Sequence, residues 1–164
     1  MAFSKTLGLA AAAMIALPGI ASAATAPDYV KMAGASDLYE KKSSQLVMGS
    51  TKNAGIRRFA NEMVTDHTKS TAMVKAAAMK AGMHPAPPML DAKQQGMIRE
   101  LTSAKGTGRD HLYVQQQKAA HQEALSLHQD YSSSGDNAGL KAAAGKIVPV
   151  VQHHIEMLNA MPAM

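Results

Sequence analysis

Long stretches of helix-forming residues, separated by a few short breaks, constrain the fold of this sequence most. The breaks are STKNAG at 50–55, AGMHPAPPM at 81–89, KGTGRD at 105–110 and SSSGDN at 132–137. Glycine weakens a helix, and proline removes a backbone donor and blocks its continuation. Between the breaks the chain is rich in Ala, Met, Lys and Gln, which favour helices. The sequence therefore predicts an all-α protein.

The spacing of apolar residues predicts where these helices lie. We expect four long helices, over 28–50, 54–80, 110–132 and 137–160, and a short helix over 90–104. Asp28 is the candidate cap of the first helix. Short turns join the first two and the last two long helices, so each pair should be antiparallel. A long connection carrying the short helix joins the pairs, which predicts a ferritin-like antiparallel four-helix bundle with one crossover.

The N-terminal residues are typical of a secretory signal peptide. Lys5 precedes a short apolar run over 7–17, and small residues at 21–23 form a cleavage pattern. We expect cleavage after Ala23, then a linker over 24–27 and a bundle domain over 28–164. No later stretch reaches the length of about 18 apolar residues that a membrane helix needs. The predicted location is outside the cytoplasm, in the periplasm where the host has two membranes.

Composition excludes several classes of function. The chain has no cysteine, so neither disulfides nor thiolate metal ligands are available. Its formal net charge of +5 comes from single Lys and Arg residues spread along the helices, and only 4% of residues are aromatic. This pattern does not indicate nucleic-acid binding. Protein partners are not predicted, and a homo-oligomer stays open.

Three segments resemble a ferritin-like family of exported bacterial proteins that is catalogued as a domain of unknown function. They are RFANEMVTDHTKS at 58–70, YVQQQKAAHQEALSLHQ at 113–129 and IVPVVQHHIEML at 147–158. Members are often labelled as outer membrane proteins. The chain departs from the pattern in EKKSSQL at 40–46, where a serine replaces an expected glycine, and in its 13 methionines. The resemblance implies a fold and export, and no settled activity.

The sequence argues against a di-iron site. Ferritin-like di-iron proteins use Glu-x-x-His motifs on two of their helices. Four glutamates are candidates for this motif, but none has histidine three positions later: they are Glu62, Glu100, Glu123 and Glu156.

A single metal ion is a separate possibility. Glu40, His67, His121 and His154 lie at similar distances from the turns that join their helices, so they should fall at one height of the bundle. Three imidazoles and a carboxylate suit Zn²⁺, Cu²⁺, Mn²⁺ or Fe²⁺. The alternative is a hydrogen-bonded network without metal, in which Glu40 pairs with His67, and His121 with Gln117 or Tyr113.

Methionine and histidine also suggest a copper site, because thioether sulfur binds Cu(I). One group lies around the end of the second helix and another near the C-terminus; the candidate ligands are Met79, Met83, His84, Met89, His153 and Met157. Methionine is equally an adaptable core residue. We expect His153 and His128 to be partly exposed.

Three functions remain open. The first is a non-enzymatic binding or stress-related protein whose Glu/His cluster holds one divalent metal ion. The second is a mononuclear metal oxidoreductase that uses the same cluster, and the third is a periplasmic copper buffer. Hydrolase chemistry is disfavoured, because Asp66 and His67 diverge by about 100° on their helix and the amides within a helix are already bonded.

Overall fold

The computed structural model describes residues 24–161. Within this range the chain forms five helices and no strand: α1 (Ala26–Met48), α2 (Ala54–Lys80), α3 (Ala92–Ser103), α4 (Gly106–Ser134) and α5 (Ala138–Ala160). The predicted all-α class is confirmed. No helix of the described residues is long and apolar enough to cross a membrane. The predicted signal peptide lies outside the described residues.

Helix α1 begins earlier than predicted. Thr25 is its N-cap, because the Thr25 hydroxyl accepts a hydrogen bond from the Asp28 backbone N–H. The Thr25 hydroxyl also lies 2.7 Å from the Asp28 carboxylate, to which it donates. Pro27 fits the first turn, where a backbone donor has no partner within the helix. Asp28 is therefore not the cap, and the expected linker over 24–27 shrinks to its first two residues.

Helix α4 also begins earlier, at Gly106 rather than Asp110. Gly106 has a φ of 53°, in the left-handed region that glycine adopts without strain, so the chain turns directly into the helix. The Arg109 side chain secures this turn by donating to the backbone oxygens of Ala104 and Thr102. The glycines of this segment therefore mark a sharp turn, not a loop.

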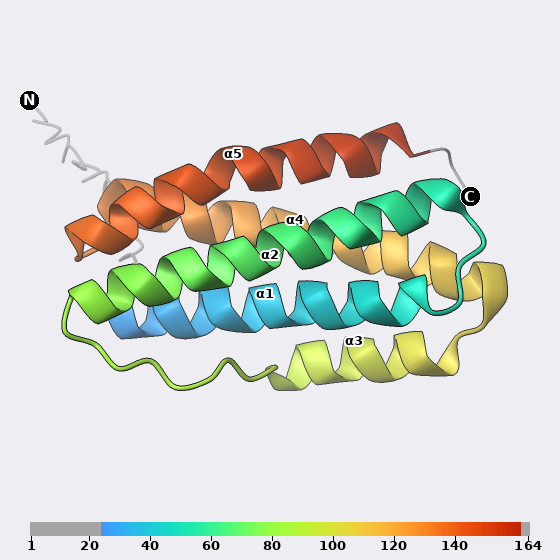
Figure 1. The fold of residues 1–164 in the computed structure, drawn as a ribbon, viewed down its shortest axis with the longest axis horizontal. Helices are drawn as coiled ribbons and strands as arrows, with labels where there is room; N and C mark the ends of the chain where they lie inside the picture. The colour runs from blue at the N-terminus through green and yellow to red at the C-terminus, as the bar shows by residue number, and fades with distance from the viewer. Residues whose placement is uncertain (1–23, 162–164) are drawn as a thin grey trace, which may run out of the picture.

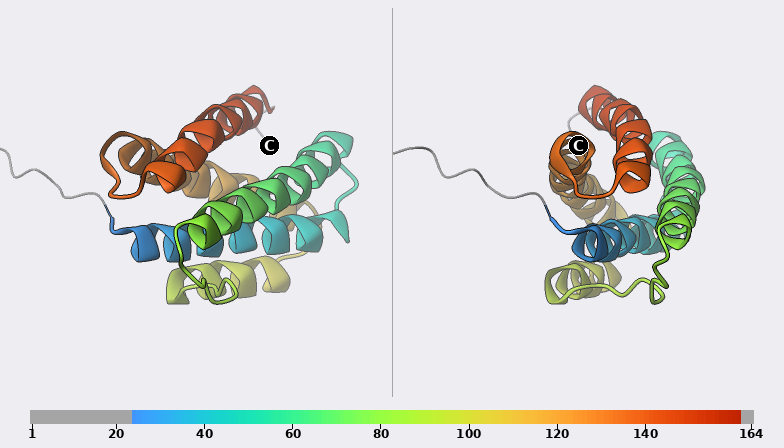
Figure 2. Two further views of the ribbon diagram at one scale, coloured as in Figure 1. Left: turned by 60° about the vertical axis from the view of Figure 1, so that its left-hand side comes forward. Right: turned by 90° about the vertical axis from the view of Figure 1, so that its left-hand side faces the viewer.

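The helices form a bundle. Helix α1 packs along α2, and α4 along α5; the two pairs meet where α1 contacts α4 and α2 contacts α5. Helix α3 lies outside these four, against α1 and α4, as Figures 1 and 2 show. The extended segment 81–91 carries the chain back along the bundle before α3 begins.

Neighbouring helices α1 and α4 run antiparallel, with their register fixed by polar contacts. Tyr39 donates to Gln116, and the hydroxyls of Ser44 and Tyr113 lie 2.7 Å apart. Residues further along α1 contact residues earlier in α4, so the two helices run in opposite directions. These bonds let the tyrosine rings fill the core while their hydroxyls stay satisfied.

The core of the bundle consists of two apolar clusters with a polar layer between them. One cluster includes Ala33, Val74, Ala124 and Val151, and the other includes Val47, Met63, Val114 and Leu158. On each long helix the residues between these limits include buried polar side chains: Asp37, Glu40, Ser43 and Ser44 on α1, His67 and Ser70 on α2, Gln116, Gln117 and His121 on α4, and His154 on α5. Burying so many polar groups together is costly unless they are paired, so this layer marks the candidate site.

Candidate metal centre

Three buried histidines meet in the polar layer, each from a different helix. His67 lies on α2, His121 on α4 and His154 on α5. One ring nitrogen of each lies within 4.8 Å of the corresponding nitrogens of the other two. The ring centroids are 5.4–5.7 Å apart. This spacing brings three nitrogen ligands to a single point.

One nitrogen of each of these rings has a hydrogen-bond partner, and the other is called the inner nitrogen below. His67 Nδ1 lies 2.8 Å from Asp37 Oδ1, and His121 Nδ1 lies 2.9 Å from the Gln117 carbonyl oxygen. His154 Nε2 lies 3.4 Å from Asp66 Oδ2. Each partner is an acceptor, so the outer nitrogen carries the proton of the neutral ring. The inner nitrogen is then left with a lone pair.

The inner nitrogens have no hydrogen-bond partner among residues 24–161. They are His67 Nε2, His121 Nε2 and His154 Nδ1. Both carboxylate oxygens of Glu40 are likewise buried without a partner in the described part of the chain. An unsatisfied buried polar group costs about 1–3 kcal/mol, and more when charged. In their unprotonated forms the three nitrogens and the carboxylate can only accept, so a proton or a metal ion is the partner that would satisfy them.

Glu40 lies beside the three histidines, but not in the predicted contact. Its Oε1 is 3.6 Å from His121 Nδ1, the nitrogen that faces the Gln117 carbonyl. The predicted Glu40–His67 pair is wrong, because Asp37, one turn earlier on α1, takes the hydrogen bond of His67. His121 does contact Gln117, one of its two predicted partners. The contact is with the backbone oxygen of Gln117 and not with its side chain.

The electrostatics of the cluster keep two of its rings neutral. Burial, with the nearby charges of His67 and His154, lowers the pKa of His121 to about 3. Burial and the charge of His67 lower the pKa of His154 to about 4. Neutral imidazole is the form that binds metal. Near neutral pH these two rings therefore need lose no proton to act as ligands.

His67 and Glu40 carry the titratable charge of the site. Burial lowers the pKa of His67, but the hydrogen bond to Asp37 and the surrounding carboxylates outweigh burial and leave it raised. Burial raises the pKa of Glu40 to about 7, against the attraction of His67. Protons on either of these two groups therefore compete with a metal ion for the site.

Two aspartates orient the cluster, and the sequence reasoning missed both roles. Asp37 precedes Glu40 by three residues, which places both on one face of α1, and this spacing could have found it. Asp66 diverges from its neighbour His67, as expected, and instead faces His154 on α5. Only contacts between helices reveal that second role.

Phe59 closes the apolar side of the cluster. Its ring centroid lies 6.1 Å from that of His121 and 6.3 Å from that of His154. Asp66, by contrast, is on the side facing solvent, with 22% of its side chain exposed. Asp66 therefore lies between the buried His154 ring and solvent, where α2 contacts α5.

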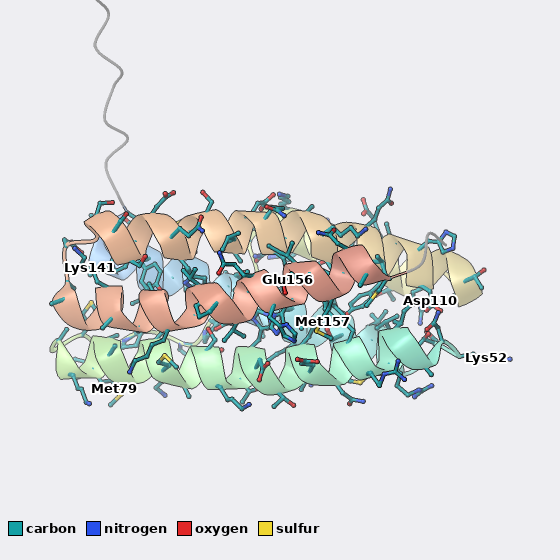
Figure 3. The ribbon with its side chains drawn as sticks, turned by 90° about the horizontal axis from the view of Figure 1, so that it is seen from above. Lys52, Met79, Asp110, Lys141, Glu156 and Met157 are labelled. Carbon is teal, nitrogen blue, oxygen red and sulfur yellow. The ribbon has the colours of Figure 1, made fainter. Side chains whose placement is uncertain are left out.

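The alternative copper ligands lie in two separate places. Met79 and His84 are exposed near the end of α2, with Met83 half-buried close by in sequence, while the exposed Met89 lies just before α3. Met157 is half-buried one turn beyond His154 on α5, against the cluster that holds Leu158. Figure 3 shows Met79 at one end of α2 and Met157 further along, at the seam between α5 and α2. The fold does not bring the six predicted copper ligands together.

The two remaining histidine predictions have different outcomes. His153 is exposed, as predicted. The prediction for His128 is wrong: it is buried, and its Nδ1 lies 2.9 Å from the Tyr29 hydroxyl. His128 follows His121 by two turns on the same face of α4, so it points into the bundle, where Tyr29 provides a partner.

The fold and the site define a class: a helical-bundle protein with a buried histidine cluster at its centre. Residues 11–161 match the sequence profile of a family described as a domain of unknown function, DUF4142. The chain belongs to that family. No curated protein matches the sequence.

Several solved structures are similar in fold. CopM in its Cu(I)-bound form has a TM-score of 0.70 at 12% identity, over 83% of this chain and 94% of that chain. A DUF305 fragment from Deinococcus radiodurans has a TM-score of 0.71 at 11% identity, over 84% and 95%. A DUF305 protein from Streptomyces coelicolor, described as secreted, has a TM-score of 0.64 at 14% identity, over 82% and 88%. These relatives share the bundle.

Proposed function

We propose that this is an exported, ferritin-like bundle protein that binds one divalent transition-metal ion between His67, His121 and His154, with Glu40 as the nearby carboxylate. The proposal rests on the meeting of three buried histidines: one ring nitrogen of each lies within 4.8 Å of the others, and each ring has one buried nitrogen without a hydrogen-bond partner among the described residues. The role is binding, not catalysis.

The contacts behind the histidines support metal binding over a purely structural network. Metal-ligating histidines almost always donate their second nitrogen to a carboxylate or a backbone carbonyl. Here Asp37, the Gln117 carbonyl and Asp66 hold those positions. A structural network would instead pair the inner nitrogens with donors, since buried polar groups are rarely left alone.

The donor set also favours particular ions. Three imidazole nitrogens suit Zn²⁺ and Cu²⁺ better than Mn²⁺, and nitrogen sites generally bind Cu²⁺ most tightly. The proposed order of affinity is therefore Cu²⁺, then Zn²⁺, then Mn²⁺. The fold similarity to CopM, whose structure holds copper, is compatible with this order.

The burial of the cluster favours a binding role over an oxidoreductase. His121 and His154 are fully buried, and Phe59 packs against both. A substrate would need a path to an open coordination position, and the three histidines are at most 4% exposed. We therefore propose that the protein holds the metal ion and does not use it to transform a substrate.

Export completes the proposal. It is supported by the Lys5, apolar run and small-residue pattern of the N-terminal residues and by the secreted relative from Streptomyces coelicolor. The ferritin-like assignment is supported by the two antiparallel pairs and the long crossover that carries α3.

Elemental analysis and metal titration test this function. Protein purified without chelators should contain about one ion per chain and bind Cu²⁺ and Zn²⁺ at one tight site. The His67→Ala, His154→Ala variant should lose this binding. The matched control, His84→Ala with His111→Ala, removes two exposed histidines that lie outside the cluster and should keep it. Wild-type protein that takes up no metal on titration would refute the proposal.

A further inference from the structure

A second group of metal-binding side chains lies on the surface directly outside the histidine cluster. Glu62, Asp66 and His154 each offer one ligand atom, and these atoms lie within 4.8 Å of one another. Glu62 and Asp66 are one turn apart on α2, so both face α5. Their side chains are 35% and 22% exposed, while that of His154 is 1% exposed.

His153 extends this group toward solvent. Its Nε2 lies 3.8 Å from Glu62 Oε1, and its Nδ1 lies 4.0 Å from Glu156 Oε2. As neighbours on α5, His153 and His154 point in different directions, one outward and one inward. Figure 3 looks onto this α2–α5 face and labels Glu156, which lies on α5 at the same level.

We propose that Glu62, Asp66, His153 and the Nε2 edge of His154 form an outer metal site that captures a divalent transition-metal ion and delivers it to the inner histidines. The outer metal site depends on the positions of these residues alone. Its role in delivery rests on the function proposed above.

His154 links the two sites, because its two nitrogens face different ones. Nε2 lies on the side of Asp66, and Nδ1 is the buried nitrogen of the inner cluster. A neutral imidazole has one lone pair and one N–H. When an ion occupies the outer site, Nε2 binds it and Nδ1 carries the proton. When an ion occupies the inner site, Nδ1 binds it and Nε2 carries the proton, facing Asp66. The ring therefore serves one site at a time, which suits transfer more than double occupancy.

The ligand types of the two sites also favour transfer from the outer site to the inner site. The outer site offers two carboxylates beside imidazole, partly open to water, whereas the inner site offers three imidazoles away from water. Borderline ions such as Cu²⁺ and Zn²⁺ favour nitrogen over carboxylate oxygen. The outer site should therefore bind weakly and the inner site tightly, so that an ion moves inward.

Lys69 competes with an ion for the outer site. Its ammonium lies 2.9 Å from Asp66 Oδ1, and 69% of its side chain is exposed. Such an exposed pair is weak, so an incoming divalent ion can displace the lysine. Removing Lys69 should therefore strengthen capture without touching the inner histidines.

Stopped-flow loading with Co²⁺ alone tests delivery. The Glu62→Gln, His153→Ala variant loses ligands that contact only the outer side, so its equilibrium affinity at the inner site should equal that of wild type. Its loading rate should fall by about tenfold, the effect of losing about 1.4 kcal/mol of capture affinity, and Lys69→Met should load faster than wild type. The control is Glu123→Gln, which removes an exposed carboxylate paired with Lys93 on another face. Equal loading rates in all four proteins would overturn delivery.

Capture is tested separately in a His121→Phe background, which removes one inner ligand next to Phe59. This protein should bind one Co²⁺ weakly, and Glu62→Gln with His153→Ala should abolish that binding. Circular dichroism establishes that both proteins are folded. Weak binding here together with no tight site in wild type would refute the inner-site function and retain the outer site. Binding that survives the double substitution would overturn the outer site.

Discussion

His67 Nδ1 lies 2.8 Å from Asp37 Oδ1, and both side chains are almost fully buried between α1 and α2. This pair holds the ring 5.6–5.7 Å, between centroids, from the rings of His121 and His154, and leaves Nε2 as its buried nitrogen without a partner in the described residues. The Thr71 hydroxyl lies 2.9 Å from the other Asp37 oxygen, so the carboxylate is held on both sides. Asp37 is thus a positioning residue for the cluster.

Replacing Asp37 should weaken metal binding without removing a ligand. Asp37→Asn keeps the shape but loses the negative charge that strengthens the His67 imidazole as a ligand. Changes of this kind typically cost about 10–100-fold in metal affinity. Competition titrations with Zn²⁺ and a chelator measure the loss. The control is Asp130→Asn, which alters an exposed aspartate on α4 and should leave the affinity unchanged. Unchanged affinity in Asp37→Asn would mean that the pair is not part of the site.

Glu40 should make the metal-free protein sensitive to pH. Burial raises the pKa of Glu40 from 4.5 to about 7, so the folded state holds this proton more tightly than the unfolded state. The stabilisation from the raised pKa is fully present below 4.5 and is lost as pH rises through 7. Glutamine mimics the protonated acid. Glu40→Gln should therefore gain stability relative to wild type between pH 4.5 and 8, by up to about 3 kcal/mol.

Denaturant unfolding of both metal-free proteins at several pH values measures this difference. Only the difference between the two proteins is informative, because the lowered pKa values of His121 and His154 change the stability of both in the opposite direction. A difference that does not change with pH would show that the Glu40 carboxylate is not held protonated by burial.

Metal binding near neutral pH should release protons. The hydrogen bond to Asp37 and the surrounding carboxylates raise the pKa of His67 despite burial, and burial raises the pKa of Glu40 to about 7. A metal ion must displace any proton that these groups hold, so binding should release protons and weaken as pH falls. Calorimetric titration with Zn²⁺ in buffers of different ionisation enthalpy measures the number released. An enthalpy that is independent of the buffer would contradict this assignment.

The sequence predicted the helices well because their breaks are strong local signals. Helix α2 begins at Ala54 and ends at Lys80, as the flanking Asn53 and the proline cluster indicated. The predicted starts of α1 and α4 were too late. Helix α1 begins at Ala26, capped by the Thr25 hydroxyl, and α4 begins at Gly106, where the Arg109 side chain secures the turn. Such contacts depend on the folded backbone, so helical spacing alone does not reveal them.

The meeting of the histidines followed from counting residues along antiparallel helices, but their partners did not. The rise of a helix fixes the height of His67, His121 and His154 to within about one turn. Which carboxylate reaches which ring depends on helix rotation and on distances of a few ångströms. Asp37 and Glu40 lie on the same face of α1, and packing against α2 selects Asp37. His128 was misjudged because its partner, Tyr29, comes from another helix.

Tyr29 and His128 offer a way to separate a structural histidine from a ligand. Tyr29→Phe removes the hydroxyl that faces His128 Nδ1 and leaves the ring to stack on Tyr131, whose centroid is 3.9 Å away. The unpaired buried nitrogen should lower the free energy of unfolding by about 1–3 kcal/mol. Metal affinity should be unchanged, since the inner nitrogens of the cluster belong to other rings. Denaturant unfolding and Zn²⁺ titration of the same preparation measure both, and a parallel loss of metal would show that His128 takes part in the site.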